Sequence, residues 1–268
     1  MNEERLYAKF YDLEYENKRD DVDFYRRLTQ KIKGPILECG CGAGRILVPI
    51  ARSGKEIWGF DANVEMLNIT RRKIRSLTLN RQVKIFKDDL VEFSSPLLKD
   101  KKFNFIFLSF DSLAYLAQKN ETYYSPEEAR QRQYKALKNI TSHLNKDGLF
   151  AFDLFAPNDL SKEYTVRHHF SRAINKDETW SLSSAIQVPE EYIFQIHYFM
   201  EIFKREGSIK RWHYPISAYQ TTFREIKLLL DEVGLHPIKF YGDFGLKPYK
   251  PNSEQMIFIC RKENKKGG

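Results

Sequence analysis

The sequence contains only three cysteines, at positions 39, 41 and 260. Cys39 and Cys41 are one residue apart, and no second closely spaced pair could complete a four-ligand zinc site. The same scarcity excludes a disulfide framework of the kind that stabilises small secreted domains. We therefore predict that the cysteines are small core residues and that they hold no metal.

Long apolar runs are also absent. No stretch approaches the roughly 20 residues needed to cross a bilayer, and the first ten residues, MNEERLYAKF, lack the apolar segment of a signal peptide. We expect a soluble, cytoplasmic protein with no membrane partner. With 268 residues, of which 42% are hydrophobic, the chain is long enough for one substantial core and an insertion.

The sequence has no large excess of charge of one sign. Its 44 basic and 36 acidic residues give a net charge of +8, which indicates a mixed surface rather than a basic one. The densest basic cluster, at positions 71–75, falls on an expected helix, where a solvated face is the more frequent explanation. A nucleic-acid partner is therefore not expected.

Three glycines on alternate positions, Gly40, Gly42 and Gly44, follow a short apolar run in the segment PILECGCGAGR. Their missing Cβ atoms allow positive φ angles and a close approach of a ligand before a helix begins near Ile46. The spacing predicts a strand, a tight loop and a helix that hold a nucleotide-like ligand. The dinucleotide fingerprint would require its third glycine at position 45, where this chain has Arg45.

A second strand is expected to end in Asp61, which is 21 residues beyond Gly40. A carboxylate at that strand end can accept both ribose hydroxyls of a nucleotide. Asp61 could instead cap the helix that begins at Val64, and the two roles are compatible. Met66 has two alternatives of equal weight, contact with an adenine ring or core packing.

Glu38 stands two residues before Gly40, so the pattern is E-x-G-x-G-x-G. This pattern, with acids at positions 61 and 89, resembles the first motifs of class I S-adenosylmethionine-dependent methyltransferases, within the bacterial amino-sugar and glycine N-methyltransferase group. The resemblance implies that the glycines pass under the methionine and ribose of S-adenosylmethionine. It also implies that Glu38 fixes the loop and the amino-acid end of this cofactor.

The resemblance extends to the third strand, at 83–86, where Asp89 is followed four residues later by Phe93. It implies that Asp89 accepts the adenine amino group, with Asp88 beside it and the Leu90 amide facing the ring. Asp88 replaces the glycine usual in this family. The full set of expected cofactor-binding residues is Tyr11, Tyr15, Glu38, Gly40, Gly42, Gly44, Asp61, Ala62, Met66, Asp88, Asp89, Leu90 and Ser109.

Two further strands complete a parallel series. The fourth ends at Leu108, which places Ser109 near the transferred methyl group. Ser125 begins a helix as a capping box with Glu128, residues 145–148 should end that helix, and the fifth strand follows at 149–155. We predict a doubly wound, seven-stranded Rossmann-like α/β sheet whose last strand runs against the other six, in residues 35–156 and 221–263.

Two segments lie outside that sheet. Residues 1–34 show helical spacing, with Tyr7, Tyr11 and Tyr15 at every fourth position. These rings could pack on the sheet or close over a sulfonium by cation–π attraction, and the resemblance favours closure by Tyr11 and Tyr15. Residues 157–220 predict an inserted antiparallel sheet, with turns at 175–177, 189–190 and 206–207. It could be a substrate cap, a decoration or a homodimer interface.

Methyl transfer is an in-line displacement that depends on positioning and on exclusion of water, so neither a metal nor a covalent nucleophile is required. No Asn-Pro-Pro-Tyr motif follows the fourth strand and no cysteine stands where a pyrimidine-C5 enzyme needs one. Methylation of nucleobases is therefore disfavoured. Asp153, Asn158 and Asp159 are the only hint of a divalent cation, and we expect no metal.

No catalytic base stands out in the sequence. The candidates are His168, His169, His197, His213 and Tyr115, with Tyr123 as a further hydrogen-bonding residue. We expect an enzyme that methylates a small-molecule acceptor, with an amine favoured and a hydroxyl possible. An RNA or protein methyltransferase, and a non-catalytic module that binds S-adenosylmethionine, remain as alternatives.

Overall fold

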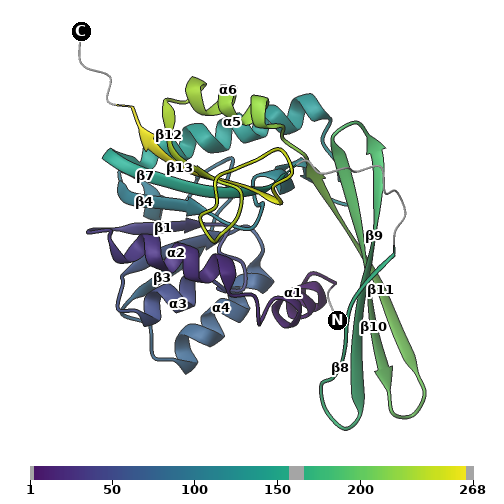
Figure 1. Cartoon of the computed structure of the whole chain (residues 1–268). Helices are drawn as coiled ribbons and strands as arrows, with labels where there is room; N and C mark the ends of the chain where they lie inside the picture. The colour runs from purple at the N-terminus through teal and green to yellow at the C-terminus, as the bar shows by residue number, and fades with distance from the viewer. Residues whose placement is uncertain (1–2, 157–165, 264–268) are drawn as a thin grey trace.

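The computed structural model describes residues 3–156 and 166–263, and its centre is a seven-stranded sheet in the order β12-β13-β7-β4-β1-β2-β3 (Figure 1). The strands are β1 (Ile36–Cys39), β2 (Ile57–Asp61), β3 (Val83–Lys87), β4 (Phe103–Leu108), β7 (Leu144–Phe155), β12 (Leu235–Tyr241) and β13 (Gln255–Lys262). Neighbouring strands are parallel except at β13, which is antiparallel to both β7 and β12. The predicted α/β sheet is confirmed.

Helices cover both faces of this sheet. They are α2 (Asp20–Gln30), α3 (Leu47–Arg52) and α4 (Val64–Ser76) on one face, and α5 (Pro126–His143) and α6 (Phe223–Glu232) on the other. Successive strand residues point to opposite faces, so Ile36 packs with α2–α4 whereas Leu37 packs with α5 and α6. No described helix has both the length and the apolar character that crossing a bilayer would require.

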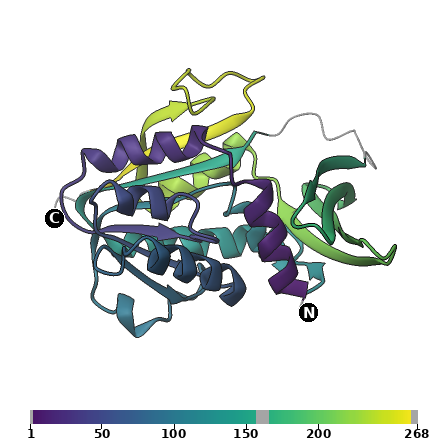
Figure 2. The ribbon, with the colours of Figure 1, turned by 90° about the horizontal axis from the view of Figure 1, so that it is seen from below.

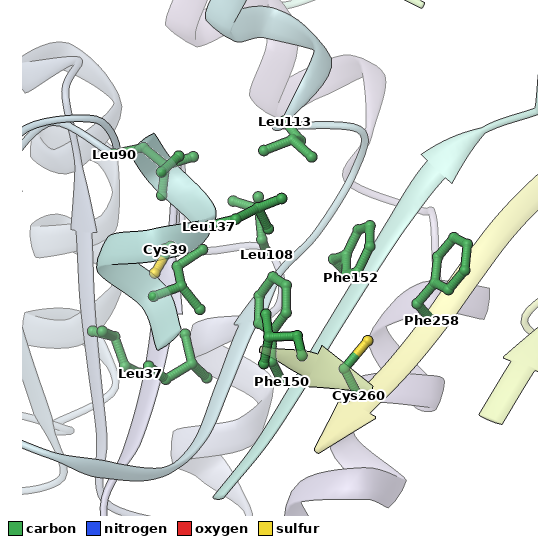
Figure 3. Close-up of a cluster of buried hydrophobic side chains, with 14 of the residues drawn as sticks. Leu37, Cys39, Leu90, Leu108, Leu113, Leu137, Phe150, Phe152, Phe258 and Cys260 are labelled. Atoms are coloured by element: carbon green, nitrogen blue, oxygen red, sulfur yellow. The ribbon is translucent and has the colours of Figure 1, made fainter. Parts of the chain in front are cut away.

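Stacked aromatic rings form the core under α5 and α6. The Phe152 ring of β7 stacks between Phe150 of the same strand and Phe258 of β13, with ring centres 5.0 Å apart in each pair (Figure 3). Cys39 and Cys260 fill space in the same cluster (Figure 3), and all three cysteines are free and buried. The prediction of core cysteines is confirmed.

A second, four-stranded antiparallel sheet follows β7 in the chain and stands apart from the first (Figure 1). Its strands are β8 (Arg167–Ala173), β9 (Glu178–Glu190), β10 (Ile193–Lys204) and β11 (Ile209–Tyr219), in the order β11-β10-β9-β8. The predicted antiparallel insertion is confirmed, although its expected start at 157 lies outside the described residues. The turn expected at 189–190 is wrong by two residues, because β9 continues through Glu190 and Tyr192 takes the positive φ of 66°.

Helix α1 (Glu3–Glu14) lies between the two sheets (Figure 2). Its Leu6 and Phe10 side chains pack on the second sheet, where the Phe10 ring stacks on Trp180 at 4.8 Å. At the other side, Asp12 accepts from Lys73 Nζ of α4 at 2.5 Å. Helix α1 therefore bridges the two parts of the molecule.

Two connections differ from the prediction. Helix α5 ends at His143, so residues 145–148 belong to β7 rather than to the helix end; Leu144 already pairs with Phe103 of β4. A small hairpin of β5 (Gln118–Lys119) and β6 (Thr122–Tyr123), preceded by the 3-10 helix η2 (Ala114–Ala117), was not anticipated. Its two-residue strands are too short to produce a periodic pattern. A further 3-10 helix, η1 (Pro96–Leu98), precedes β4.

Capping boxes begin both helices of the α5–α6 face, and the one predicted at Ser125 is confirmed. At α6, the Glu225 N–H donates to Thr222 Oγ1 at 3.2 Å, and the Thr222 N–H donates to Glu225 Oε2 at 2.8 Å.

We expect Thr222→Ala to lower the free energy of unfolding by about 1 kcal/mol, because the N–H of Glu225 loses its acceptor and the Glu225 carboxylate loses the donor hydroxyl. Urea unfolding measures this change. Thr222→Ser is the matched control, since it keeps the hydroxyl and should retain most of the stability. Equal stabilities of the alanine variant and the wild type would contradict the prediction.

Candidate active site

A cavity of about 1230 Å³ opens between the carboxyl ends of β1, β2 and β4, helix α1, and strands β10 and β11. It lies where the strand order reverses on either side of β1, which is the usual position of a ligand site in a doubly wound sheet. Of the predicted site residues, those that line it are Tyr11, Tyr15, Glu38, Gly40, Gly42, Asp61, Ala62, Met66, Ser109, Tyr115, His197 and His213. Those outside its lining are Gly44, Asp88, Asp89, Leu90, His168 and His169.

The glycine loop takes the conformation for which glycine was expected. Gly40, Gly42 and Gly44 have φ angles of 66°, 49° and 75°. Gly42 faces open space, whereas a Cβ on Gly44 would meet the Thr70 side chain of α4 at 2.9 Å. Gly42 thus leaves room beside the cavity, and Gly44 allows the loop to pack on α4.

Asp61 joins the glycine loop to the end of β2. Its Oδ2 accepts from the Gly42 N–H and its Oδ1 accepts from the Asn63 N–H, both at 2.8 Å. Burial raises the pKa of its carboxyl. The cap of α4 is Asn63, whose side chain accepts from the N–H groups of Glu65 and Met66, so Asp61 does not serve as that N-cap.

Two charged side chains in the lining each keep a buried atom without a partner among the described residues. Glu38 is 2% exposed; its Oε1 accepts from Ser109 Oγ at 3.4 Å and its Oε2 has no partner. Burial raises the pKa of Glu38. Arg45 donates through both Nη atoms to Asp21 of α2 at 2.6 Å, and its buried Nε is unpaired.

Arg45 and Asp21 were not identified from the sequence as site residues. The available signal was Arg45 itself, which replaces the glycine of a dinucleotide fingerprint and directly follows the last glycine of the loop. The Arg45 guanidinium lies 4.9 Å from the centre of the Phe110 ring. A fixed cation is therefore part of the cavity wall next to the glycine loop.

Aromatic rings form another part of the cavity wall, and Tyr7 and Tyr11 pack against the cluster that contains Ala43 of the glycine loop. Tyr15 lies 4.8 Å from Tyr11 and 4.7 Å from Phe110, and Tyr7 stacks on Tyr214 of β11 at 4.5 Å. Burial raises the pKa of Tyr11 to about 12, although Arg45 opposes this effect. These hydroxyls are therefore protonated near neutral pH and can donate hydrogen bonds.

The candidate histidines do not gather at one point. His197 Nδ1 and His213 Nε2 are 2.8 Å apart, and burial and the neighbouring His213 lower the pKa of His197. Because side chains alternate along a strand, these rings lie on the face opposite Tyr198 and Tyr214, which pack with α1.

The other two histidines lie away from the cavity. His169 Nδ1 lies 2.7 Å from Glu14 of α1, and its Nε2 lies 2.8 Å from Ser184 Oγ, so this ring links α1 to the second sheet. His168 is exposed. Tyr115 lines the cavity, and burial raises its pKa well above the usual value.

The acids after β3 support their own loop. Asp88 accepts from the N–H groups of Ser94 and Ser95, and Asp89 Oδ1 accepts from the Val91 N–H at 2.7 Å. The Asp88 N–H donates to the carbonyl of Asp61 at 3.3 Å, so this loop runs beside the cavity.

Asp153 has a structural role that the sequence did not indicate. Its Oδ1 accepts from the Tyr25 hydroxyl at 2.6 Å, and its Oδ2 accepts from the N–H groups of Phe110 at 2.9 Å and Asp111 at 3.4 Å. The described residues contain no cluster of three or more His, Cys, Asp or Glu side chains that could hold a metal. The other two members of the cation hint, residues 158 and 159, lie outside the described residues.

The turn after β4 is strained. Phe110 and Asp111 are consecutive non-glycine residues with φ angles of 59° and 56°, each of which costs on the order of 1–3 kcal/mol. The hydrogen bonds to Asp153 offset part of that cost.

A doubly wound sheet with this glycine loop defines a nucleotide-binding α/β protein, and comparison with known proteins identifies its class. Residues 36–148 match the family model of a methyltransferase domain. A protein of Geobacillus sp. (strain WCH70), provisionally named a methyltransferase, is 27% identical over 240 residues, which is 85% of this chain and 84% of the relative.

Solved methyltransferases share the fold. An S-adenosylmethionine-dependent methyltransferase of Clostridium acetobutylicum aligns with a TM-score of 0.76 and 18% identity over 97% of this chain and 100% of that chain. A sugar N-methyltransferase of Streptoalloteichus sp. aligns with a TM-score of 0.72 and 14% identity over 95% and 93%. The protein is an enzyme with a methyltransferase domain and the class I methyltransferase fold, and the recognition from the glycine motif is confirmed at this level.

The burial of Asp153 predicts a measurable pH dependence of stability. Burial raises the pKa of this carboxyl from 3.8 to about 6, so the folded protein holds the proton more tightly than the unfolded chain between these values. Its stabilising effect is therefore complete below pH 4 and is lost as the pH rises through 6.

We expect the free energy of unfolding of the wild type to fall by about 3 kcal/mol relative to Asp153→Asn between pH 4 and pH 7, at 1.36 kcal/mol per pKa unit. Urea unfolding of both proteins across this interval measures the difference. A difference that stays constant with pH would contradict the prediction.

Proposed function

We propose that the enzyme transfers the methyl group of S-adenosylmethionine to a small-molecule acceptor, and that the acceptor atom is an amine nitrogen rather than a hydroxyl oxygen. The observation that carries the proposal is the pair of unpaired buried atoms, Glu38 Oε2 and Arg45 Nε, in the wall beside the glycine loop. Buried polar atoms without partners are costly, so a ligand that supplies both partners would bind favourably.

The amino-acid end of S-adenosylmethionine carries an ammonium and a carboxylate. In our proposal Glu38 accepts from the ammonium and Arg45 donates to the carboxylate, which gives each charge a partner of opposite sign. Gly40 and Gly42 leave space for the chain of the cofactor, with Ser109 near the methyl group. Gly44 does not contact the cofactor in this proposal; it allows the loop to pack on α4.

The nucleoside end lies over the ends of β2 and β3. Each Asp61 oxygen accepts one backbone N–H and has a second lone pair free to accept a ribose hydroxyl. We assign Ala62 and Met66 to the ribose and adenine side of the cavity. Asp88, Asp89 and Leu90 are proposed for the adenine edge, which requires this loop to contact the base from beside the cavity.

S-adenosylmethionine supplies an electrophilic methyl group on a sulfonium. Tyr11, Tyr15 and Phe110 form an aromatic wall that can stabilise this cation and exclude water. Within this proposal, residues 1–34 act as a cap over the cofactor and residues 157–220 as a cap over the acceptor.

The pKa values and pairing of the side chains that line the cavity favour an amine as the acceptor. A neutral amine attacks through its own lone pair and releases its proton to water afterwards, whereas an alcohol or an ammonium must first lose its proton to a base. Burial raises the pKa values of the tyrosines that line the cavity, and the imidazoles of His197 and His213, which also line it, pair with each other on the face of their sheet opposite Tyr198 and Tyr214. The structural similarity to a sugar N-methyltransferase supports an amino-sugar acceptor.

Two further proposals concern the cellular compartment and the oligomeric state of the enzyme. The three buried free cysteines fit a reducing, cytoplasmic compartment. The second sheet exposes Phe199 on the face that carries His197 and His213, and we propose this face as the surface of a homodimer.

Asp61→Ala should weaken the binding of S-adenosylhomocysteine by about tenfold or more, because the loss of two hydrogen bonds to a charged group costs about 1.5–3 kcal/mol or more. Calorimetric titration measures the affinity, with NAD as the control ligand. Asp231→Ala, an exposed acid on α6, is the matched control and should bind normally. Unchanged affinity in Asp61→Ala would remove the ribose assignment.

The acceptor atom can be tested with paired substrates. We expect methyl transfer to an amino sugar and none to the sugar in which a hydroxyl replaces that amine, measured by mass spectrometry of the product. Equal methylation of both would contradict the amine assignment. Binding of S-adenosylhomocysteine without transfer to any amine, alcohol, RNA or protein would support a non-catalytic module instead.

A further inference from the structure

The Phe110 ring contacts three other side chains of the cavity wall. It lies edge-on to Tyr15 at 4.7 Å and to Tyr11 at 6.1 Å, and the Arg45 guanidinium lies 4.9 Å from its centre. It thus contacts both tyrosines assigned to the sulfonium and the cation assigned to the cofactor carboxylate. A shift of this ring would disturb all three.

The backbone of Phe110 does not favour this position by itself. Its φ of 59° is rare for a bulky residue, and Asp111 follows with a φ of 56°. The N–H groups of these two residues both donate to one oxygen of the Asp153 carboxylate.

Asp153 is itself fixed from two directions. It lies in β7, next to β4 in the sheet, and is 2% exposed. The Tyr25 hydroxyl of α2 donates to its other oxygen at 2.6 Å. The Tyr25 ring stacks on Phe107 at 4.8 Å, which ties this donor to the core.

We propose that Asp153 is a positioning residue of the methyl-transfer site: its carboxylate holds the strained turn at Phe110 and Asp111 and thereby sets the Phe110 ring against Tyr11, Tyr15 and Arg45. The inference rests on the proposed function, since it concerns the binding of the same cofactor. Asp153 acts through Phe110 and does not touch the cofactor.

A double-mutant cycle on S-adenosylhomocysteine affinity tests this role. Phe110→Ala and Asp153→Ala should each weaken binding about tenfold, and the double variant should bind within about twofold of Phe110→Ala, because residues that act through one another are not additive. Asp153→Asn should retain most of the affinity, since its amide oxygen can still accept the two N–H groups.

Controls separate this role from a general loss of stability. Thr222→Ala destabilises α6 away from the cavity and should leave the affinity unchanged. Should Asp153→Ala fail to fold, Tyr25→Phe replaces it in the cycle, because it removes the hydroxyl that fixes Asp153 and keeps the ring. We expect Tyr25→Phe to weaken binding about threefold in the wild-type background. In the Phe110→Ala background the same substitution should cause no further loss of affinity.

Additive losses in the double variant, or unchanged affinity in the variant that perturbs Asp153, would overturn the inference and leave the proposed function standing. No binding of S-adenosylhomocysteine by the wild type would overturn both. Unchanged affinity in Phe110→Ala would also overturn the inference, because Asp153 would then have no ring to act through.

Discussion

Hydrogen bonds from backbone N–H groups to buried and half-buried carboxylates shape the ligand edge of this molecule. Asp61 holds the glycine loop, Asp88 holds the loop after β3, and Asp153 holds the turn after β4. Each satisfies N–H groups that irregular backbone at a strand end would otherwise leave unpaired. Burial disfavours the charged forms of Asp61 and Asp153, so the desolvation of these acids is part of the cost of a preformed cavity.

The same loops connect parts of the chain that the sheet alone leaves apart. Arg45 follows the glycine loop and pairs with Asp21 at the start of α2, while Lys73 of α4 reaches Asp12 of α1. A bidentate pair between buried groups is geometrically specific. Lys73 also donates to the carbonyl of Ala43, so the glycine loop is fixed to both helices of the N-terminal segment, and Tyr11 of α1 packs beside Ala43.

The predictable features were those with a local signature. The glycine spacing predicted Gly40 and Gly42 in the cavity wall, and the strand end predicted Asp61 there. The contacts of Arg45 with Asp21 and of Asp153 with Phe110 join segments distant in sequence, and no periodicity encodes such partners. Gly44 shows a subtler limit, because the motif indicated a need for glycine but not that the need comes from Thr70 of α4.

The second sheet shows why catalytic residues are harder to predict than folds. Strand alternation already separates His197 from Tyr198 and His213 from Tyr214, but it does not tell which face turns toward α1. That choice depends on α1, whose Leu6 and Phe10 pack against the tyrosine face. Because the aromatic face is the one that buries apolar surface against α1, the imidazoles are left on the opposite face of the second sheet, at the part of the cavity lining away from α1. The hydrophobic packing of one helix therefore decides that tyrosine hydroxyls and ring faces, rather than imidazoles, lie on the α1 side of the second sheet.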